Sequence, residues 1–242
     1  MFLNKSKVFL SLTKARLSFS VVFSTLAGYI LAVELVNFFD LALLLIGGYC
    51  MVGASNSFNQ IIEKDKDALM DRTKNRPIPS GKIQPSEALS FGVITSILSI
   101  IILGLSINWL AASLLAFTIF FYAVVYTMWL KRHTVQNIVI GGAAGAFPPI
   151  IGHICATGSI GVEALILFLI IFLWTPPHFW ALALVNKSDY RVAKIPMLPI
   201  IYGDMATRKN IFIYSLLLLS LIHISEPTRQ EAMSYAVFCL KK

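Results

Sequence analysis

The chain has 242 residues, of which 57% are apolar and 13% are charged, and its mean hydropathy is +0.76. Soluble domains carry about 25% charged residues, and a globule of this length could not bury so many apolar side chains and keep a wettable surface. Disordered chains are poor in apolar residues, and the three cysteines do not form a disulfide framework because two of them lie in apolar runs. The composition therefore predicts a polytopic membrane protein.

Six continuous apolar runs are long enough to cross a hydrocarbon core of about 30 Å. A seventh begins near Asn210 and stays apolar only to Ile222, which is about 19 Å of helix. A transmembrane barrel would show short alternating segments, so continuous runs predict an all-α bundle with six complete spans and a truncated seventh. The six expected spans are 16–34, 39–61, 86–106, 108–130, 136–154 and 162–185.

Positive charge falls on alternate connections between these spans. Before residue 220, every Lys and Arg lies at the amino end or after the second, fourth and sixth spans, whereas 34–40, 106–109 and 154–162 contain none. Cytoplasmic loops are enriched in Lys and Arg, so the amino terminus and the even-numbered loops are expected on the cytoplasmic side of the cell's inner membrane. The net charge of +8 then reflects topology, and no nucleic-acid partner is expected.

Two of the cytoplasmic loops, 62–85 and 186–209, are long and rich in ionisable residues. The connections on the opposite face are short, so we expect the chemistry of this protein at the cytoplasmic face. The competing interpretation is a pair of solvated loops whose mixed charges only orient the helices.

An acidic stripe begins the first of these loops. Asn59, Glu63, Asp67 and Asp71 are spaced by four, so a helix continuing past the second span would carry them on one face. Like charges at this spacing repel, which makes the stripe unfavourable without a cation. Carboxylate and amide oxygens suit Mg²⁺, which usually binds one or two carboxylates together with phosphate oxygens and water.

A basic stripe follows at once. Arg72 and Arg76 are also four residues apart, and an arginine pair can bind phosphate oxygens bidentately. An acidic stripe beside a basic stripe is the combination that a Mg²⁺-bound diphosphate needs.

The sequence from Asn59 to Asp67, N-x-x-x-E-x-x-x-D, closed by Met70-Asp71-Arg72-Thr73-Lys74-Asn75-Arg76-Pro77, resembles the first acidic motif of the UbiA superfamily of intramembrane prenyltransferases. The R-T-K-N-R-P ending resembles the protohaem IX farnesyltransferase branch in particular. Glu63 departs from the pattern, because many relatives carry Asp there. The later matches are Tyr126-Thr127 with Lys131-Arg132, Asn137, Gly145-Ala146-Phe147-Pro148-Pro149, the block from Pro177 to Leu184, and Asp189-Tyr190.

The resemblance implies transfer of the farnesyl group of farnesyl diphosphate to a vinyl group of haem B, giving haem O and diphosphate. It further implies Mg²⁺ as cofactor, membrane lipid as surroundings, and haem A synthase or oxidase assembly proteins as possible partners. By residue-by-residue match, the catalytic residues would be Asn59, Glu63, Asp67, Arg72 and Arg76, and the metal ligands Asn59, Glu63, Asp67 and Asp189. The substrate-contacting residues would be Asn56, Lys74, Lys131, Arg132, His178, Asp189 and Tyr190.

Several of these roles have a simpler alternative. His178 follows Thr175-Pro176-Pro177, which interrupts the sixth run, so it is either a haem ligand or a buried hydrogen-bonding residue at a kink. Lys131 and Arg132 would meet haem propionates or would only orient the helix.

Two alternative functions remain open. A UbiA-type transferase could use another acceptor, such as a quinone precursor or chlorophyllide. A transporter-like bundle would be no enzyme at all, but it should place its ionisable residues at mid-membrane rather than at one face.

The carboxyl end differs in character from the rest. Residues 222–242 resemble a translated sequencing-adapter peptide, and UbiA relatives normally have nine spans. We therefore expect a UbiA-type domain over 1–221, truncated at its end, and a non-native or disordered tail over 222–242. The alternative is a genuine short cytoplasmic or amphipathic tail.

Overall fold

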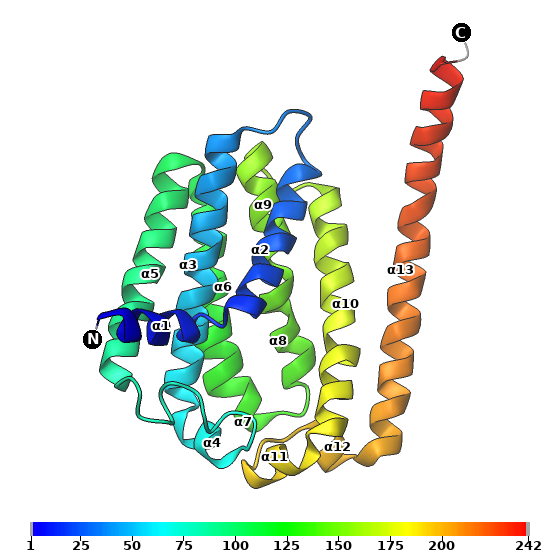
Figure 1. The fold of residues 1–242 in the computed structure, drawn as a ribbon. Helices are drawn as coiled ribbons and strands as arrows, with labels where there is room; N and C mark the ends of the chain where they lie inside the picture. Colours follow the sequence, from blue (N-terminus) through cyan, green and yellow to red (C-terminus); the bar gives the residue numbers. More distant parts are fainter. Residues whose placement is uncertain (1, 241–242) are drawn as a thin grey trace.

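The computed structural model describes the backbone of residues 2–240 and the side chains of residues 5–224. The described chain is helical and contains no strand (Figure 1). The elements are α1 (Phe2–Leu12), α2 (Ala15–Ile30), α3 (Phe38–Ile62), α4 (Lys64–Leu69), α5 (Pro85–Ser106), α6 (Trp109–Phe120), the π-helix η1 (Phe121–Leu130), α7 (Lys131–His133), α8 (Asn137–Ala146), α9 (Pro148–Thr157), α10 (Val162–Val185), α11 (Lys187–Val192), α12 (Leu198–Ile201) and α13 (Gly203–Leu240).

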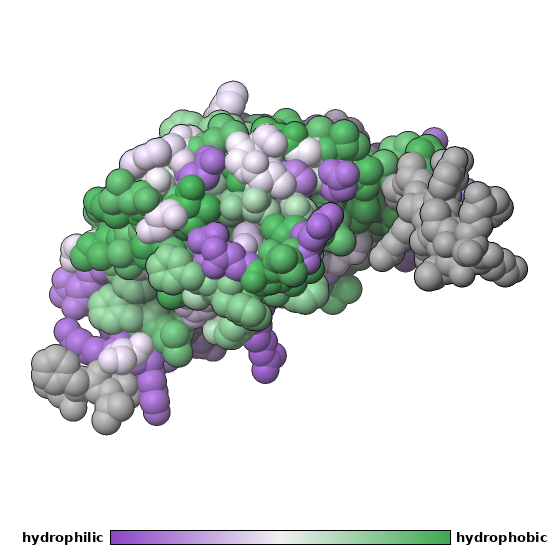
Figure 2. Space-filling view, turned by 90° about the horizontal axis from the view of Figure 1, so that it is seen from above, coloured by the Kyte–Doolittle hydropathy of each residue, from purple (hydrophilic) through white to green (hydrophobic). Residues whose placement is uncertain are grey.

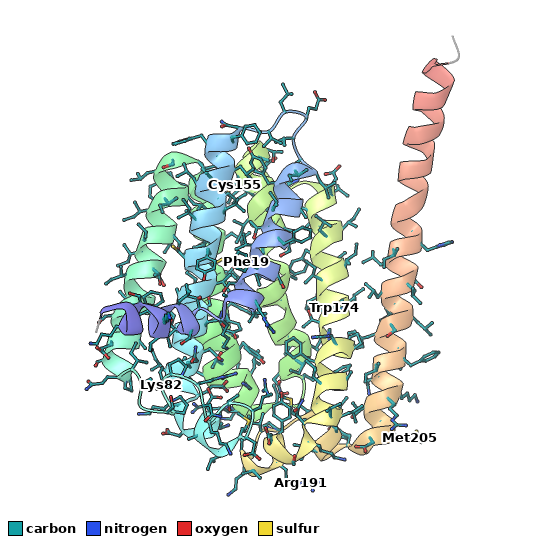
Figure 3. All side chains as sticks on the ribbon, in the orientation of Figure 1. Phe19, Lys82, Cys155, Trp174, Arg191 and Met205 are labelled. Carbon is teal, nitrogen blue, oxygen red and sulfur yellow. The ribbon has the colours of Figure 1, made fainter. Side chains whose placement is uncertain are left out.

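The long helices stand side by side, and the short helices α4, α7, α11 and α12 gather at one end of the bundle, the lower end in Figure 1. We call this the loop end. Helix α1 lies across the bundle instead of along it. Lys82 and Arg191 lie at the loop end, whereas Cys155 lies near the other end (Figure 3). The two long ionisable loops therefore meet at the same end of the molecule.

Length and hydropathy confirm a multi-pass membrane protein. Six helical segments of the described residues are long and apolar enough to span a membrane, and α2, with 16 residues, is a shorter apolar helix. Viewed from the end opposite the loop end, apolar side chains cover most of the visible surface (Figure 2). The six segments are Phe38–Ile62, Pro85–Ser106, Trp109–His133, Asn137–Thr157, Val162–Val185 and Gly203–Ile224.

Glycines allow a close helix contact between α2 and α9. A Cβ on Gly28 would lie 2.0 Å from the Pro149 carbonyl oxygen, and one on Gly152 would lie 1.9 Å from that of Thr25. Any larger side chain would push the two backbones apart. Small residues drive helix association in this way where lipid removes the hydrophobic driving force.

Two of the expected spans contain a pair of adjacent prolines, and the helix is interrupted in only one of them. The fifth span is broken, because α8 ends at Ala146 and α9 starts at Pro148. The sixth is not: α10 continues through Pro176 and Pro177 to Val185. The prolines remove the N–H partners of the Phe172 and Leu173 carbonyls, and the Thr175 hydroxyl donates to the carbonyl just before these, that of Ile171, at 2.6 Å.

The seventh helix also differs from its prediction. The apolar run ends near Ile222, but α13 is one continuous helix of 38 residues, packed against α10 and α12. A helix satisfies its own backbone hydrogen bonds whatever its side chains are, so apolar length predicts the embedded part of a helix and not its full length. Most of the expected tail over 222–242 lies outside the residues whose side chains are described.

Candidate active site

Three of the four residues of the acidic stripe come together where α3 meets α4. The Glu63 N–H donates to the Asn59 carbonyl at 3.0 Å, and the Asp67 N–H donates to the Glu63 carbonyl at 2.8 Å, so the four-residue spacing survives the junction. The side chains are buried, with Asn59 4%, Glu63 3% and Asp67 0% exposed. Buried carboxylates are costly unless they are paired or bind a metal.

The fourth residue, Asp71, leaves the stripe. Met70 has extended backbone angles and ends α4, so Asp71 is exposed and pairs with Lys74 at 2.6 Å. This hydrogen bond from Lys74 lowers the pKa of Asp71. Lys74, predicted to contact substrate, is thus occupied on the surface, where ion pairs contribute little to stability.

Each buried carboxylate has its own cation. Lys131 Nζ lies 2.5 Å from Glu63 Oε2, and Arg76 Nη1 lies 2.6 Å from Asp67 Oδ2. Removing one partner of such a buried pair costs about 3–5 kcal/mol, because the other charge is left uncompensated. We call Asn59, Glu63, Asp67, Arg76 and Lys131 the acidic cluster. The interpretation of Lys131 as only a topology signal does not fit its position in the cluster.

The π-helix η1 supplies the opposite wall of the cluster. The Asn59 amide donates to Glu63 Oε2 at 3.2 Å and to Thr127 Oγ1 at 3.3 Å. Thr127 in turn donates to the carbonyl of Tyr122, five residues earlier, at 2.7 Å. Long π-helical segments are rare and frequently mark functional sites. The pair Tyr126-Thr127 was identified in the sequence as part of the family motif, but no role was predicted for either residue.

The acidic cluster fits a cation. Asp67 Oδ1 is buried and has no hydrogen-bond partner, although Oδ2 of the same carboxylate binds Arg76. An orphaned carboxylate oxygen beside Asn59 and Glu63 is the kind of oxygen donor that Mg²⁺ prefers. Within the described residues no group of three or more His, Cys, Asp or Glu is placed to hold a metal. The oxygen donors available to a cation are two carboxylates and an amide, from Glu63, Asp67 and Asn59. Further coordination positions of the cation would be left for phosphate oxygens or water.

Asp189 connects the two ionisable loops. Its Oδ2 accepts a hydrogen bond from the backbone N–H of Arg72 at 3.2 Å. The structure does not gather it with Glu63 and Asp67 into one metal-binding group. The prediction of Asp189 as a metal ligand thus receives no support, whereas its place beside the first acidic loop does agree with a role at this site.

The expected basic stripe does not form, because residues 71–82 adopt turns instead of a helix. Pro77 disfavours helical angles at the residue before it, and Met70 has already ended α4. Arg76 points into the cluster and its side chain is 21% exposed, whereas Arg72 is exposed. Of the two arginines, the structure places only Arg76 beside the carboxylates.

Asn56 supports the backbone and does not join the cluster. Its amide donates to the carbonyl of Thr13 at 3.0 Å, and the amide of Gln60 donates to the carbonyl of Leu12 at 3.0 Å. Both carbonyls lie at the junction of α1 and α2. The next residue, Lys14, was not expected at the site, yet it interacts electrostatically with the charges of the cluster. Burial, reinforced by the positive charge of Arg76, lowers the pKa of Lys14 to about 7.

The remaining predicted residues lie around the cluster. Arg132 donates to the carbonyl of Ile62 at 2.9 Å and so caps the end of α3. Tyr190 is buried and packs in an apolar group with Met70 and Trp180. His178 is exposed and stacks on Trp174, with ring centroids 4.4 Å apart and an angle of 17° between the rings. The interpretation of His178 as a buried residue is wrong, since its imidazole is exposed, and α10 is not interrupted at Pro176 and Pro177.

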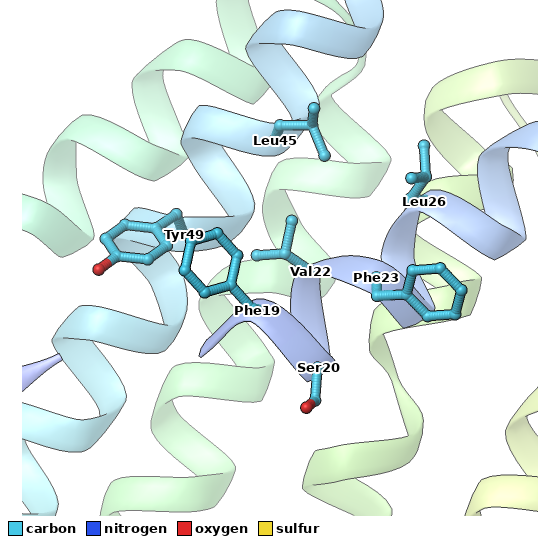
Figure 4. Close-up of a pocket in the computed structure, with 7 residues that line it drawn as sticks. All are labelled: Phe19, Ser20, Val22, Phe23, Leu26, Leu45 and Tyr49. Carbon is cyan, nitrogen blue, oxygen red and sulfur yellow. The ribbon is translucent and has the colours of Figure 1, made fainter. Parts of the chain in front are cut away.

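A separate groove elsewhere on the bundle is apolar. It encloses about 720 Å³ between α2 and α3 and is lined by Phe19, Phe23, Leu26, Leu45 and Tyr49, with Ser20 and Val22 (Figure 4). No acidic or basic side chain lines it, and an apolar groove on a membrane helix is ordinary lipid-facing surface.

Residues 21–239 match the model of the UbiA prenyltransferase family. The chain belongs to this family. It is 55% identical over 210 residues to protoheme IX farnesyltransferase 2 of Mesorhizobium japonicum, which covers 87% of this chain and 67% of that protein. The protoheme IX farnesyltransferase of Sinorhizobium fredii is 54% identical, over 86% of this chain and 66% of its own length. The chain thus spans about two thirds of the length of these UbiA relatives.

Solved UbiA structures share the fold. A structure of digeranylgeranylglyceryl phosphate synthase in membranes has a TM-score of 0.76 at 21% identity, and covers 93% of this chain and 78% of its own. A UbiA homologue from Archaeoglobus fulgidus, bound to DMAPP and Mg²⁺, has a TM-score of 0.74 at 16% identity, over 88% of this chain and 75% of its own. At these identities the likeness shows the fold alone.

Proposed function

We propose that this protein transfers the farnesyl group of farnesyl diphosphate to a vinyl group of haem B, which gives haem O and diphosphate. The observation that carries the proposal is the identity of 54–55% over about 210 residues to curated protoheme IX farnesyltransferases. In the reaction, the bond between farnesyl C1 and the diphosphate oxygen breaks, and a carbon–carbon bond to the vinyl group forms. Water then adds to the resulting cation and releases a proton, so the product carries a hydroxyethylfarnesyl group.

Asn59, Glu63 and Asp67 are the proposed ligands of Mg²⁺. The buried, unpartnered Asp67 Oδ1 supports this assignment, and the Archaeoglobus fulgidus homologue was solved with a prenyl diphosphate and Mg²⁺. Mg²⁺ bound there would stabilise the negative charge that develops on the departing diphosphate. The Asn59 amide, held between Glu63 and Thr127, orients the donor set.

Arg76 and Lys131 are the proposed diphosphate-binding cations. Each already lies within 3 Å of a carboxylate of the cluster, so a diphosphate bound there through its metal would meet both. Guanidinium and ammonium groups aimed at a site of developing charge lower the barrier most when water is excluded. Arg72 stands at the exposed edge and is proposed to contact the same diphosphate.

The acceptor is proposed to approach His178 on α10. The imidazole is accessible and stacked on Trp174, and this pair offers a flat aromatic surface and a nitrogen ligand to a porphyrin. Tyr190 and Asp189 lie on α11 at the loop end, to which α10 leads. Both substrates are lipophilic, so we propose that they enter from the membrane.

The loop end is proposed to face the cytoplasm at the cell's inner membrane. Before residue 220, all Lys and Arg lie on the segments assigned to that side, which is the pattern of the cytoplasmic face. Farnesyl diphosphate would then reach the acidic cluster from the cytoplasmic leaflet. Haem A synthase or oxidase assembly proteins would be the partners that take up haem O.

A second candidate is a UbiA-type transferase with another acceptor, because the acidic cluster recognises the diphosphate and not the acceptor. Haem extracted from membranes that contain the protein, in a host without its own haem O synthase, separates the two candidates. The proposal expects a haem species heavier by one farnesyl group and one water. Prenylation of a quinone precursor or of chlorophyllide, with haem unchanged, would overturn it.

A further inference from the structure

The junction between α1 and α2 is held in an unusual backbone conformation. Lys14 has φ 51° and ψ 62°, the left-handed region that residues with a Cβ rarely adopt. Such a residue costs about 1 kcal/mol or more and persists only where its surroundings impose it. A glycine would remove the cost, yet the sequence places a lysine there. The surroundings of Lys14 must therefore hold the backbone in this conformation.

Two buried amides of α3 impose this conformation. Asn56 and Gln60, only 2% and 1% exposed, donate to the carbonyls of Thr13 and Leu12, which the helix break leaves without helical partners. The hydroxyl of Thr13 also lies 2.8 Å from that of Tyr49 on α3. Asn56 and Gln60 precede Asn59 and Glu63 on the same helix. The helix that carries the acidic cluster thus also holds the backbone immediately before Lys14.

The charge of the cluster is not balanced once Lys14 is counted. Glu63 and Asp67 are each paired with one cation, Lys131 and Arg76. Lys14 interacts with all four of these charges, but among the described residues its ammonium forms no ion pair within 4 Å. When Lys14 is protonated, two carboxylates therefore stand against three cations. Partly buried positive charge without a partner is unfavourable, and an anion bound beside the cluster would compensate it.

We propose that Lys14 is a third cationic contact for the diphosphate of the prenyl substrate, and that Asn56 and Gln60 are positioning residues which hold the α1–α2 junction so that Lys14 reaches it. The identity of the anion rests on the proposed function. Arg76 approaches from the loop 62–85, Lys131 from the short helix α7, and Lys14 from the amino end. The diphosphate would thus be held by cations from three separate parts of the chain.

The direct test measures binding of inorganic diphosphate, in the presence of Mg²⁺, to the purified full chain by calorimetry. Lys14→Met should weaken this binding about tenfold or more, as expected for loss of a charge-assisted contact, and Lys14→Arg should recover most of it. Lys7→Met is the matched control, because Lys7 is an exposed lysine on α1. Unchanged diphosphate affinity in Lys14→Met would overturn the proposal. If Lys14→Met binds Mg²⁺ alone more tightly and binds diphosphate with unchanged affinity, the proposal is also overturned. That result would identify Lys14 as a counter-charge for the carboxylates.

The positioning role has its own test. Gln60→Leu should raise KM for farnesyl diphosphate at least fivefold with little change in kcat, and it should add little to the loss already caused by Lys14→Met, since both act through one contact. Fully additive losses, together with a lower Tm, would show that Gln60 only stabilises the fold. If the unmodified chain does not bind Mg²⁺ and diphosphate, the proposed function fails. If it binds them and Lys14→Met binds equally well, only the inference about Lys14 fails.

Discussion

The substitution Asp67→Asn removes one negative charge from the acidic cluster and leaves the shape of the side chain almost unchanged. Asp67 is fully buried, binds Arg76 through Oδ2, and leaves Oδ1 without a partner. The amide keeps an oxygen for Arg76 but removes the formal charge. Because Arg76 is 21% exposed, we expect the free energy of unfolding to fall by about 1–2 kcal/mol, less than for a fully buried pair. Turnover should fall by about 10²–10³-fold, the usual effect of losing one electrostatic contact to the transition state.

The assay follows haem O formation in membranes with saturating Mg²⁺ and farnesyl diphosphate. Asp65→Asn is the matched control, because Asp65 is an exposed carboxylate on the same short helix. A cycle with Arg76→Gln separates two roles of Asp67. If Asp67 only holds Arg76, the double variant is no worse than Arg76→Gln alone; if it also binds Mg²⁺, the double variant is markedly worse. Near-normal turnover of Asp67→Asn at saturating Mg²⁺ would refute the metal role.

Three further variants test other parts of the site. Arg72→Lys should raise KM for farnesyl diphosphate severalfold, since an ammonium lacks the bidentate geometry of a guanidinium; unchanged KM and kcat would make Arg72 a topology signal only. His178→Ala should weaken use of haem B about tenfold more than use of farnesyl diphosphate, measured as kcat/KM for each substrate, and equal losses would remove His178 from the acceptor site. The pKa of Lys14 is about 7 in the folded chain against 10.5 for the free side chain, so the unfolded state binds the extra proton between these values and stability should rise with pH from about 7 to 10. The free energy of unfolding of Lys14→Met, measured by chemical denaturation, should rise less steeply with pH than that of the unmodified chain. Identical slopes for the two proteins would show that Lys14 does not titrate in this pH range.

The fold was largely predictable because apolar length is a local property. Each continuous run had to cross the hydrocarbon core as a helix, so five expected spans correspond to single helical segments or to α8 and α9 together. Features that depend on backbone hydrogen bonding were not visible. Neither the π-helical geometry of η1 nor the continuity of α10 through Pro176 and Pro177 follows from apolar length. Periodicity alone cannot distinguish an α-helix from a π-helix in so apolar a segment.

The part of the site formed by residues close together in the sequence was predictable, whereas the part that depends on where a helix ends was not. Asn59, Glu63 and Asp67 lie within two turns, so their spacing alone indicated a shared face. Asp71 and Arg72 are as regularly spaced, but Met70 ends the helix and places both on the surface. The spacing rule holds only while the backbone stays helical. A terminating residue seven positions before the nearest proline could not be located from the sequence.

The lysines show why the rest of the site was hidden. A lysine after a membrane span is the ordinary signal of orientation, and Lys74 and Lys131 are indistinguishable by that criterion. The structure distinguishes them by burial: the side chain of Lys74 is 52% exposed and pairs with Asp71, whereas that of Lys131 is 13% exposed and pairs with Glu63. A purely topogenic charge has no reason to leave water, because its role is complete once the helix is inserted. A lysine drawn into the bundle therefore serves the acidic cluster, and by the same reasoning so does Lys14.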